Sequence, residues 1–228
     1  MIAVTTIIVS LAIFPFAVPR FLSVWRSDII FRIPTKDKVV FLTIDDAPTE
    51  GTPAILDALK RHNVRATFFI ISGRIRAPEQ IDAILKAGHS VGNHMATSRA
   101  GWKLSHEDFV RDFDRCTAAL RPHSEVRFFR PPSGYATKQQ VAYANSNGMQ
   151  AVLGSVYPFD AHFENTAIIV RLASWLSLNG GIIILHDGKD RKVRTAAVLD
   201  RLIPMLKRRG YRFGDLNEAL AIPNNAVH

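Results

Sequence analysis

Residues 39–48 read VVFLTIDDAP, an apolar run that ends in two carboxylates and a proline. Several apolar residues in succession are typical of a strand that is buried on both faces of a parallel sheet. The residues that follow such strands carry the chemistry of α/β folds, because the carboxyl ends of parallel strands meet at one edge. This stretch therefore predicts an α/β fold with Asp45 and Asp46 at its functional edge.

Three later stretches place polar residues at similar positions. They are Gly92-Asn93-His94, Arg130-Pro131-Pro132-Ser133-Gly134 and Leu185-His186-Asp187, and the last follows a second apolar run at residues 182–185. Each residue alone has an ordinary structural explanation, since aspartate is common in turns and a lone histidine is more often structural than metal-bound. Their order and shared position favour one hydrolytic site.

Apolar patterns after Lys38 predict strands and helices that alternate about seven times. The expected strands cover residues 38–44, 66–71, 126–129, 150–153, 181–185 and 211–213, and the expected helices cover 53–61, 79–87, 105–120, 137–147, 166–178 and 195–209. This alternation predicts a parallel sheet covered by helices, either open or closed into a barrel. One domain over residues 38–216 is expected, because single α/β domains commonly reach this length.

Residues 1–30 form a separate apolar segment in which Arg20 is the first charged side chain. A signal peptide, a membrane anchor and an interfacial segment are all compatible with this composition. The segment lacks a basic amino-terminal region and is interrupted by Pro15 and Pro19, which fits neither a standard signal peptide nor a standard spanning helix. We rank secretion or membrane association above a buried helix.

The formal charge of +9 raises the question of an anionic partner. The basic residues are spread along the chain and include no recognition motif. This pattern favours solubility and loose affinity for polyanionic surfaces, and we expect no specific nucleic-acid binding.

The types of residue at the strand ends indicate metal-assisted hydrolysis. Asp45 and Asp46 are successive residues, so their side chains point in different directions while remaining close together. One carboxylate can bind a metal while the other stays free as a base. Arg130 can hold a carboxylate ionised and oriented, and His186 is suited to donate a proton near neutral pH.

These motifs resemble those of the polysaccharide deacetylases with a NodB homology domain, also called carbohydrate esterase family 4. The likeness covers residues 38–216, with residues 45–48 similar to the first family motif, 87–94 to the approach to the second, 130–134 to the third and 185–187 to the fifth. The resemblance implies a distorted (β/α) barrel of about seven parallel strands. It also implies a divalent metal, usually zinc, and hydrolysis of N-acetyl groups on amino-sugar polymers or oligomers such as chitin or peptidoglycan.

The resemblance also implies a role for each matching residue. Asp45 would be the general base, oriented by Arg130, and His186 would protonate the leaving amine. The backbone N–H near Ser133 would stabilise the oxyanion, a role that tolerates serine because the donor is main chain. Tyr135 is assigned to the oxyanion and substrate side of the site.

Asp46 and His94 would be metal ligands, but the second motif departs from the family pattern. The family has His-x-x-x-His, whereas Ser98 stands four residues after His94. Neutral serine is a poor ligand, so we expect a weakened metal site in which water, Ser98 or His106 takes the third position.

The fourth motif also departs, because it keeps Asp160 but lacks the expected tryptophan and arginine. Asp160 is grouped with the substrate-side residues and is expected to support His186. Three functions stay open: an active metal-dependent deacetylase, a catalytically weak or inactive relative that binds amino-sugar polymers, and a hydrolase of another amide.

Overall fold

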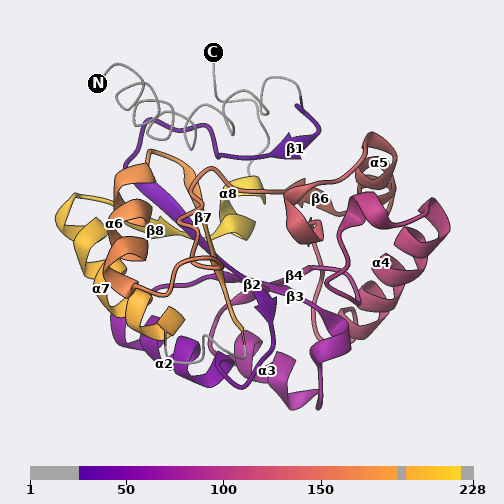
Figure 1. Cartoon of the computed structure of the whole chain (residues 1–228), viewed down its shortest axis with the longest axis horizontal. Helices are drawn as coiled ribbons and strands as arrows, with labels where there is room; N and C mark the ends of the chain where they lie inside the picture. The colour runs from indigo at the N-terminus through magenta and orange to yellow at the C-terminus, as the bar shows by residue number, and fades with distance from the viewer. Residues whose placement is uncertain (1–25, 189–193, 222–228) are drawn as a thin grey trace, which may run out of the picture.

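A computed structural model describes residues 26–188 and 194–221 (Figure 1). Most of the predicted amino-terminal segment, residues 1–25, lies outside the described residues. Among the residues that are described, no helix is both long and apolar enough to cross a membrane.

The fold is a mostly parallel α/β arrangement, as the alternating pattern predicts. The strands are β1 (Ile29–Ile30), β2 (Val39–Ala47), β3 (Thr67–Ile70), β4 (Ser90–Asn93), β5 (Phe128–Phe129), β6 (Gln150–Val152), β7 (Gly181–His186) and β8 (Arg212–Gly214). The helices are α2 (Thr52–His62), α3 (Glu79–Lys86), α4 (His106–Leu120), α5 (Lys138–Ser146), α6 (Thr166–Leu176), α7 (Arg194–Arg208) and α8 (Leu216–Ala221). Short 3-10 turns lie at Ser72–Arg74 (η1), Gly101–Lys103 (η2) and Pro132–Gly134 (η3).

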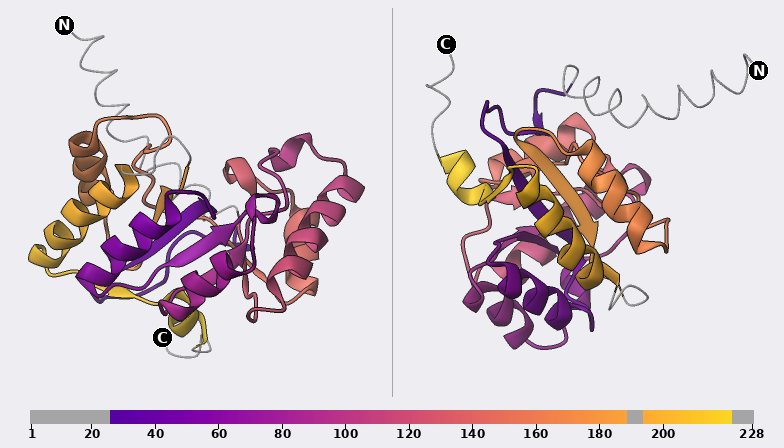
Figure 2. Two further views of the ribbon diagram at one scale, coloured as in Figure 1. Left: turned by 90° about the horizontal axis from the view of Figure 1, so that it is seen from below. Right: turned by 90° about the vertical axis from the view of Figure 1, so that its left-hand side faces the viewer.

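The strands form one sheet in the order β1-β6-β5-β4-β3-β2-β7, and every pairing between them is parallel. Strand β8 pairs with the first part of β2, and β3 pairs with its second part. A parallel bridge between Val156 and Ile183 joins the segment after β6 to β7. The sheet thus curves round to meet itself as a distorted barrel, with helices on the outside (Figure 2).

Strand β2 pairs with β3, β7 and β8 and is buried on both faces. Val40, Leu42 and Ile44 belong to the larger apolar cluster, whereas Val39 and Phe41 belong to a smaller cluster on the opposite face. This double burial explains why the sequence of β2 is an unbroken apolar run. It also fixes Asp45 and Asp46 near the carboxyl end of β2.

Side-chain caps set the starts of two helices near the site. Ser105 accepts a hydrogen bond from the backbone N–H of Asp108 at the start of α4. Thr137 and Gln140 form a reciprocal capping box at the start of α5. Such caps satisfy backbone donors that the first turn of a helix leaves open.

The described sheet has eight strands, where about seven were expected. Strands β1 and β4 were not predicted as strands, because β1 has two residues and β4 reads Ser-Val-Gly-Asn. Both depend on pairing with neighbours rather than on local propensity. Since β1 pairs with β6, the sheet includes residues on the amino-terminal side of the predicted boundary at residue 38.

Candidate active site

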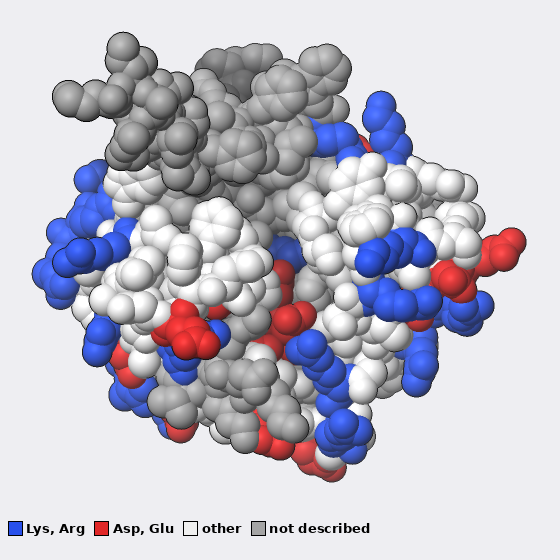
Figure 3. All heavy atoms as spheres, in the orientation of Figure 1, with Lys and Arg blue, Asp and Glu red and all other residues white. Residues whose placement is uncertain are grey.

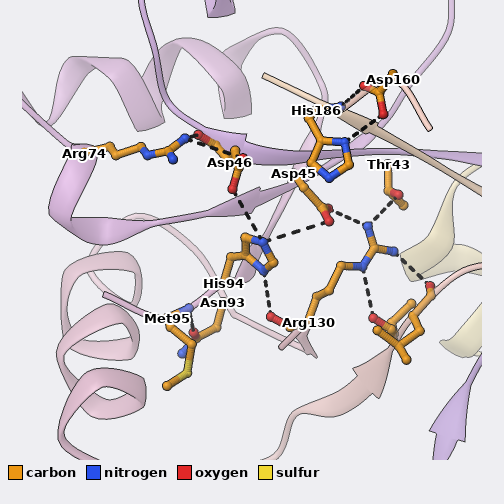
Figure 4. A network of polar contacts seen from close by, with 12 residues as sticks. Thr43, Asp45, Asp46, Arg74, Asn93, His94, Met95, Arg130, Asp160 and His186 are labelled. Carbon is orange, nitrogen blue, oxygen red and sulfur yellow. Dashed lines mark hydrogen bonds and ion pairs between the residues drawn. The ribbon is translucent and has the colours of Figure 1, made fainter. Parts of the chain in front are cut away.

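Five of the predicted residues converge at the carboxyl ends of four strands. Asp45 and Asp46 lie near the end of β2, His94 follows β4, Arg130 follows β5, and His186 is the last residue of β7. Figure 4 shows their side chains grouped around one point. The register of the sheet pairs Asp45 with His186 directly across β2 and β7. The expectation that these motifs share one edge is therefore confirmed.

The centre of the cluster is a buried ion pair between Asp45 and Arg130. The Arg130 Nη1 donates to Asp45 Oδ1 over 2.5 Å and to the Thr43 hydroxyl over 2.8 Å. Its Nε and Nη2 donate to the backbone carbonyls of Val152 and Leu153. Asp45 is 4% exposed and Arg130 is 1% exposed. A buried guanidinium with this many acceptors is held in one orientation, and it fixes the carboxylate that it pairs with.

This environment keeps Asp45 ionised. Burial alone would raise the pKa of the Asp45 carboxyl, but the charge and hydrogen bond of Arg130, together with His94 and His186, outweigh it and hold the pKa below its ordinary value. Asp45 Oδ1 faces Arg130, while Oδ2 lies 3.9 Å from His94 Nε2. The second oxygen is thus directed toward the rest of the cluster.

His94 has the ring orientation of a metal ligand. Its Nδ1 lies 2.7 Å from the backbone carbonyl oxygen of Arg130. A carbonyl can only accept, so Nδ1 carries the proton and the lone pair of the neutral ring is on Nε2. His94 Nε2 lies 3.8 Å from Asp46 Oδ1. This is the arrangement in which a backbone acceptor fixes the tautomer of a metal-binding histidine.

Asp46 is positioned by its backbone and by Arg74. Its φ angle is 71°, in the left-handed region that non-glycine residues rarely adopt. The Arg74 Nη1 donates to the Asp46 carbonyl over 2.5 Å and lies 3.9 Å from Asp46 Oδ2. Asp46 Oδ1 and Asp45 Oδ2 lie 3.8 and 3.9 Å from His94 Nε2, so the carboxylates of two successive residues both face this nitrogen.

Two protein donors, the Asp46 carboxylate and His94 Nε2, fit a divalent metal. Two ligands bound to a tetrahedral zinc ion lie about 3.4 Å apart, and the 3.8 Å between His94 Nε2 and Asp46 Oδ1 is close to that span. Within residues 26–188 and 194–221, no group of three or more histidine, cysteine, aspartate or glutamate side chains is arranged to hold a metal ion. Among these residues, Asp46 and His94 are the pair whose donor atoms lie near the span of two zinc ligands.

The predicted third position, Ser98, does not lie one helical turn after His94. The segment after β4 is non-helical, Met95 adopts a φ of 70°, and Ser98 is exposed. Hydrogen bonds from the Ala96 N–H to the carbonyl of Asp112 and from the Thr97 hydroxyl to its carboxylate attach this loop to α4. Residues 94–98 therefore do not have the helical geometry that places residues i and i+4 on one face, because the positive φ of Met95 turns the chain.

His106 does not complete the set of ligands either. It is the first residue of α4, it is exposed, and its ring packs against the edge of Tyr143 at 6.1 Å between centroids. The contact of its ring with Tyr143 therefore lies on the helix surface and involves neither Asp46 nor His94.

His186 and Asp160 form the second polar pair of the site. His186 Nδ1 lies 2.8 Å from Asp160 Oδ1, and the His186 backbone N–H donates to Asp160 Oδ2 over 2.8 Å. Burial opposes the charge on His186, but the hydrogen bond and charge of Asp160, with the charges of Asp45 and Asp46, raise its pKa above the ordinary value of histidine. Both carboxylate oxygens of Asp160 are thus directed to His186, and its role in supporting that residue stays a prediction.

Ser133 and Tyr135 lie beside the cluster on the loop that follows Arg130. Ser133 is exposed in the turn η3 and has a φ of 65°. Tyr135 follows that turn and is 48% exposed. Both positions are compatible with the predicted contacts to a substrate, and their roles stay predictions.

Three residues that shape the site were not predicted from the sequence: Thr43, Arg74 and Asp187. Thr43 could have been found, because it lies two residues before Asp45 and therefore on the same face of β2. Arg74 carries no such signal, since its contact depends on where the fold places the turn η1.

Asp187 is 1% exposed, accepts hydrogen bonds from the hydroxyls of Thr49 and Thr52, and donates its backbone N–H to the Asp45 carbonyl. It anchors the loop after β2.

A polar cavity of about 690 Å³ opens beside Asp46. Its lining includes Thr49, Arg74, Gln80 and His162. Figure 3 shows acidic side chains near the centre of this face, with lysine and arginine side chains around them. A cavity of this size, rich in donors and acceptors, suits a polar ligand such as a sugar.

Comparisons with known proteins agree with the motifs. A family model described as Polysaccharide deacetylase matches residues 32–152. The chain is 32% identical over 197 residues to a peptidoglycan-N-acetylglucosamine deacetylase of Bacillus cereus, covering 84% of this chain and 92% of the relative. It is 34% identical over 187 residues to a chitooligosaccharide deacetylase of Sinorhizobium fredii, covering 75% and 87%. Among solved structures, a CE4 family pseudoenzyme from Bacillus anthracis superposes with a TM-score of 0.78 at 28% identity, covering 84% of this chain and 68% of that one. The chain belongs to the polysaccharide deacetylase family.

Proposed function

We propose that this protein is a metal-dependent hydrolase that removes N-acetyl groups from amino-sugar polymers or oligomers of the chitin or peptidoglycan type. The observation that carries the proposal is the buried Asp45–Arg130 pair beside the His94 and Asp46 donors, with His186 across the sheet. Metal binding alone does not require the ion pair or the second histidine. Their presence supports catalysis.

Asp45 acts as the general base. Its Oδ2 receives a proton from the water that attacks the acetyl carbonyl carbon, while Oδ1 stays bonded to Arg130. Arg130 keeps the carboxylate ionised and oriented before each turnover. A base held in this way does not need to reorganise as the water approaches.

His186 acts as the general acid. Its Nδ1 is held by Asp160, which leaves Nε2 to donate a proton to the amine nitrogen as the carbon–nitrogen bond breaks. The products are acetate and a free amino sugar. The backbone N–H near Ser133 donates to the oxygen of the tetrahedral intermediate, where negative charge develops.

Asp46 and His94 are the residues that would hold the metal. A divalent ion bound there would polarise the acetyl carbonyl and lower the pKa of a bound water. Zinc suits a histidine and a carboxylate donor. With two strong protein donors, the affinity is expected to be lower than that of a site with an aspartate and two histidines.

A second candidate function is supported by Ser98. It stands where the family motif has a histidine and is exposed on a non-helical loop. A weak or inactive relative that still binds amino-sugar polymers would have such a site, and one structural neighbour is described as a pseudoenzyme. A deacetylase whose activity depends on a high metal concentration explains both observations. It accounts for Ser98 at the place of a histidine ligand, and for the intact polar pairs that Asp45 and His186 each form.

The location of the protein follows from the proposed substrate. We propose that residues 38–216 act outside the cytoplasm or at a membrane, because cell-wall and chitin-type polymers are found there. The uncharged run at residues 2–18 supports this proposal. Fractionation of cells that express the full chain tests it, and recovery of the protein solely from the soluble cytoplasm would contradict it.

Acetate release from a panel of acetylated amino-sugar oligomers tests the proposed function. The wild-type protein, supplied with a divalent metal, is expected to release acetate, and Asp45→Asn is expected to abolish release while it still binds metal. Loss of metal binding in Asp45→Asn would show that the roles of the two aspartates are exchanged. Release that Asp45→Asn leaves unchanged would remove Asp45 from the mechanism.

A further inference from the structure

A short segment, residues 70–74, lies between the two parts of the chain that carry the metal donors. In the sheet, β3 is placed between β2, which carries Asp46, and β4, which directly precedes His94. The segment begins with the last residue of β3 and continues through the turn η1 to Arg74. It contains no carboxylate and no imidazole, so any effect that it has on a metal must act through Asp46 and His94.

Backbone hydrogen bonds join this segment to the residues beside both donors. On the Asp46 side, the Ile71 N–H donates to the carbonyl of Ala47 over 2.9 Å. On the His94 side, the bonds run from the His94 N–H to the carbonyl of Ile70, from the Ser72 N–H to that of Met95, and from the Gly73 N–H to that of Ala96, over 2.9, 3.1 and 3.0 Å. The segment therefore links the two donors through the backbone.

The Arg74 side chain adds a direct contact with Asp46. Its Nη1 donates to the Asp46 carbonyl over 2.5 Å and lies 3.9 Å from Asp46 Oδ2, whereas Asp46 Oδ1 lies 3.8 Å from His94 Nε2 (Figure 4). The guanidinium is thus near one carboxylate oxygen and the imidazole is near the other. Because Asp46 has a φ of 71°, which is costly for a residue with a side chain, a bond to its carbonyl stabilises the conformation that directs Oδ1 to His94.

Gly73 allows the turn to lie this close to the loop after His94. A Cβ at position 73 would be 2.5 Å from the carbonyl oxygen of Ala96, which is closer than two such atoms can approach. Any other residue at position 73 would therefore push the turn η1 and the loop apart. The position of Arg74 relative to Asp46 depends on this close contact, because Arg74 is the next residue of the turn.

A cation beside a metal ligand has two opposite effects on metal affinity. Its charge repels a divalent ion, whereas its hydrogen bond holds the ligand in place. The Arg74 side chain is 34% exposed, so solvent screens its charge. Removing a hydrogen bond that orients a metal ligand typically lowers metal affinity by about tenfold or more. We therefore expect the positioning effect of Arg74 to exceed the repulsion.

We propose that the turn η1, with Arg74 as its positioning residue, sets the separation of Asp46 and His94 before a metal binds and so raises the affinity for Zn²⁺. This inference rests on the proposed function, because it concerns the metal donors of the same site. Within residues 26–188 and 194–221, no group of three donor side chains is arranged for a metal. The affinity thus depends strongly on how well these two donors are placed in advance.

The affinity of the full chain for Zn²⁺, measured by competition with a chelator, tests the inference. Arg74→Met removes the hydrogen bond to the Asp46 carbonyl and is expected to lower the affinity by about tenfold. Arg74→Lys can still donate to this carbonyl and is expected to recover part of the loss. Gly73→Ala is expected to lower the affinity as well, although it changes no side chain that contacts Asp46 or His94.

The Gly73→Ala/Arg74→Met double variant asks whether both residues act through one turn. If they do, its loss of affinity is smaller than the product of the two single losses. A loss equal to that product would overturn the common role of the turn. Thermal unfolding of the metal-free variants checks that the fold is kept. Should Gly73→Ala not fold, the two Arg74 variants decide alone.

Arg76→Met is the matched control. Arg76 lines the same cavity as Arg74 and carries the same charge, but its described hydrogen bond runs from its backbone N–H to Gln80 Oε1. Its replacement is expected to leave the affinity for Zn²⁺ unchanged. A rise of affinity in Arg74→Met, or an equal loss in Arg74→Met and Arg76→Met, would overturn the inference, because the hydrogen bond to Asp46 would then not decide the affinity.

Metal binding can be measured whether or not the protein releases acetate, which separates this inference from the proposed function. A tenfold loss of affinity in Arg74→Met supports the inference even if the wild type releases no acetate, in which case the proposed function fails. Unchanged affinity in Arg74→Met overturns the inference, and acetate release by the wild type then leaves the proposed function standing. Absence of Zn²⁺ binding by the wild type overturns both.

Discussion

Arg130→Met is expected to destabilise the protein by about 3–5 kcal/mol, because it removes the guanidinium that is hydrogen-bonded to the buried Asp45 carboxylate. Arg130 and Asp45 are 1% and 4% exposed, and their charged atoms are 2.5 Å apart. Methionine fills much of the space of arginine but leaves the Asp45 charge without its partner. It also leaves the carbonyls of Val152 and Leu153 without these donors.

Urea unfolding monitored by circular dichroism measures the effect. The Asp45→Asn/Arg130→Met double variant is expected to be more stable than Arg130→Met, because it removes the unpaired charge. The cycle of the two single variants and the double variant should give a coupling free energy of about 1–3 kcal/mol. Should Arg130→Met alone not fold, the double variant still reports whether the unpaired carboxylate was the cause.

Arg61 and Asp200 provide a matched control pair. Their charged atoms are 2.7 Å apart, but the two side chains are 54% and 39% exposed. Solvent screens such pairs, so Arg61→Met is expected to cost less than about 1 kcal/mol. The reasoning is refuted if Arg130→Met costs no more than Arg61→Met, since burial would then not decide the strength of the pair.

Two further predictions concern the metal and the acid. Ser98→His supplies the donor that the family motif has and is expected to raise the affinity for Zn²⁺ about tenfold or more, measured by competition with a chelator; unchanged affinity would show that position 98 does not reach Asp46 and His94. Asp160→Asn removes the charge that raises the pKa of His186, so the pKa of His186 is expected to fall. The protonated form of the acid is then lost at a lower pH, and the decline of kcat at high pH is expected to move to lower pH. A pH profile of kcat that does not move would contradict the role of His186 as the acid.

The strands that carry the motifs could be predicted because buried strands consist of runs of apolar residues. Strands β2 and β7 are neighbours that are mostly buried, and their apolar runs directly precede Asp45 and His186. Strands β1 and β4 could not be predicted in this way, since their pairing depends on neighbours brought in by the fold. For the same reason β4 carries His94 to the site although it reads as a short polar segment.

The site, like the sheet, has features that could be predicted from the sequence and features that could not. Its main residues follow strands in sequence, so their convergence could be predicted from the rule that parallel strands share one edge. The path of the loop after His94 could not, because it depends on the left-handed conformation of Met95 and on contacts with α4. The contact of Arg74 with the Asp46 carbonyl likewise depends on a turn that sequence spacing does not specify.

The central claim is that the cluster of Asp45, Asp46, His94 and His186 hydrolyses an N-acetyl group with the help of a divalent metal. Acetate release from an N-acetylglucosamine oligomer should therefore be measured before chelation, after chelation, and after Zn²⁺ is restored. Activity is expected to fall after chelation, to return with Zn²⁺, and to require a higher concentration of Zn²⁺ in His94→Ala. Undiminished acetate release from the metal-free protein would contradict the account.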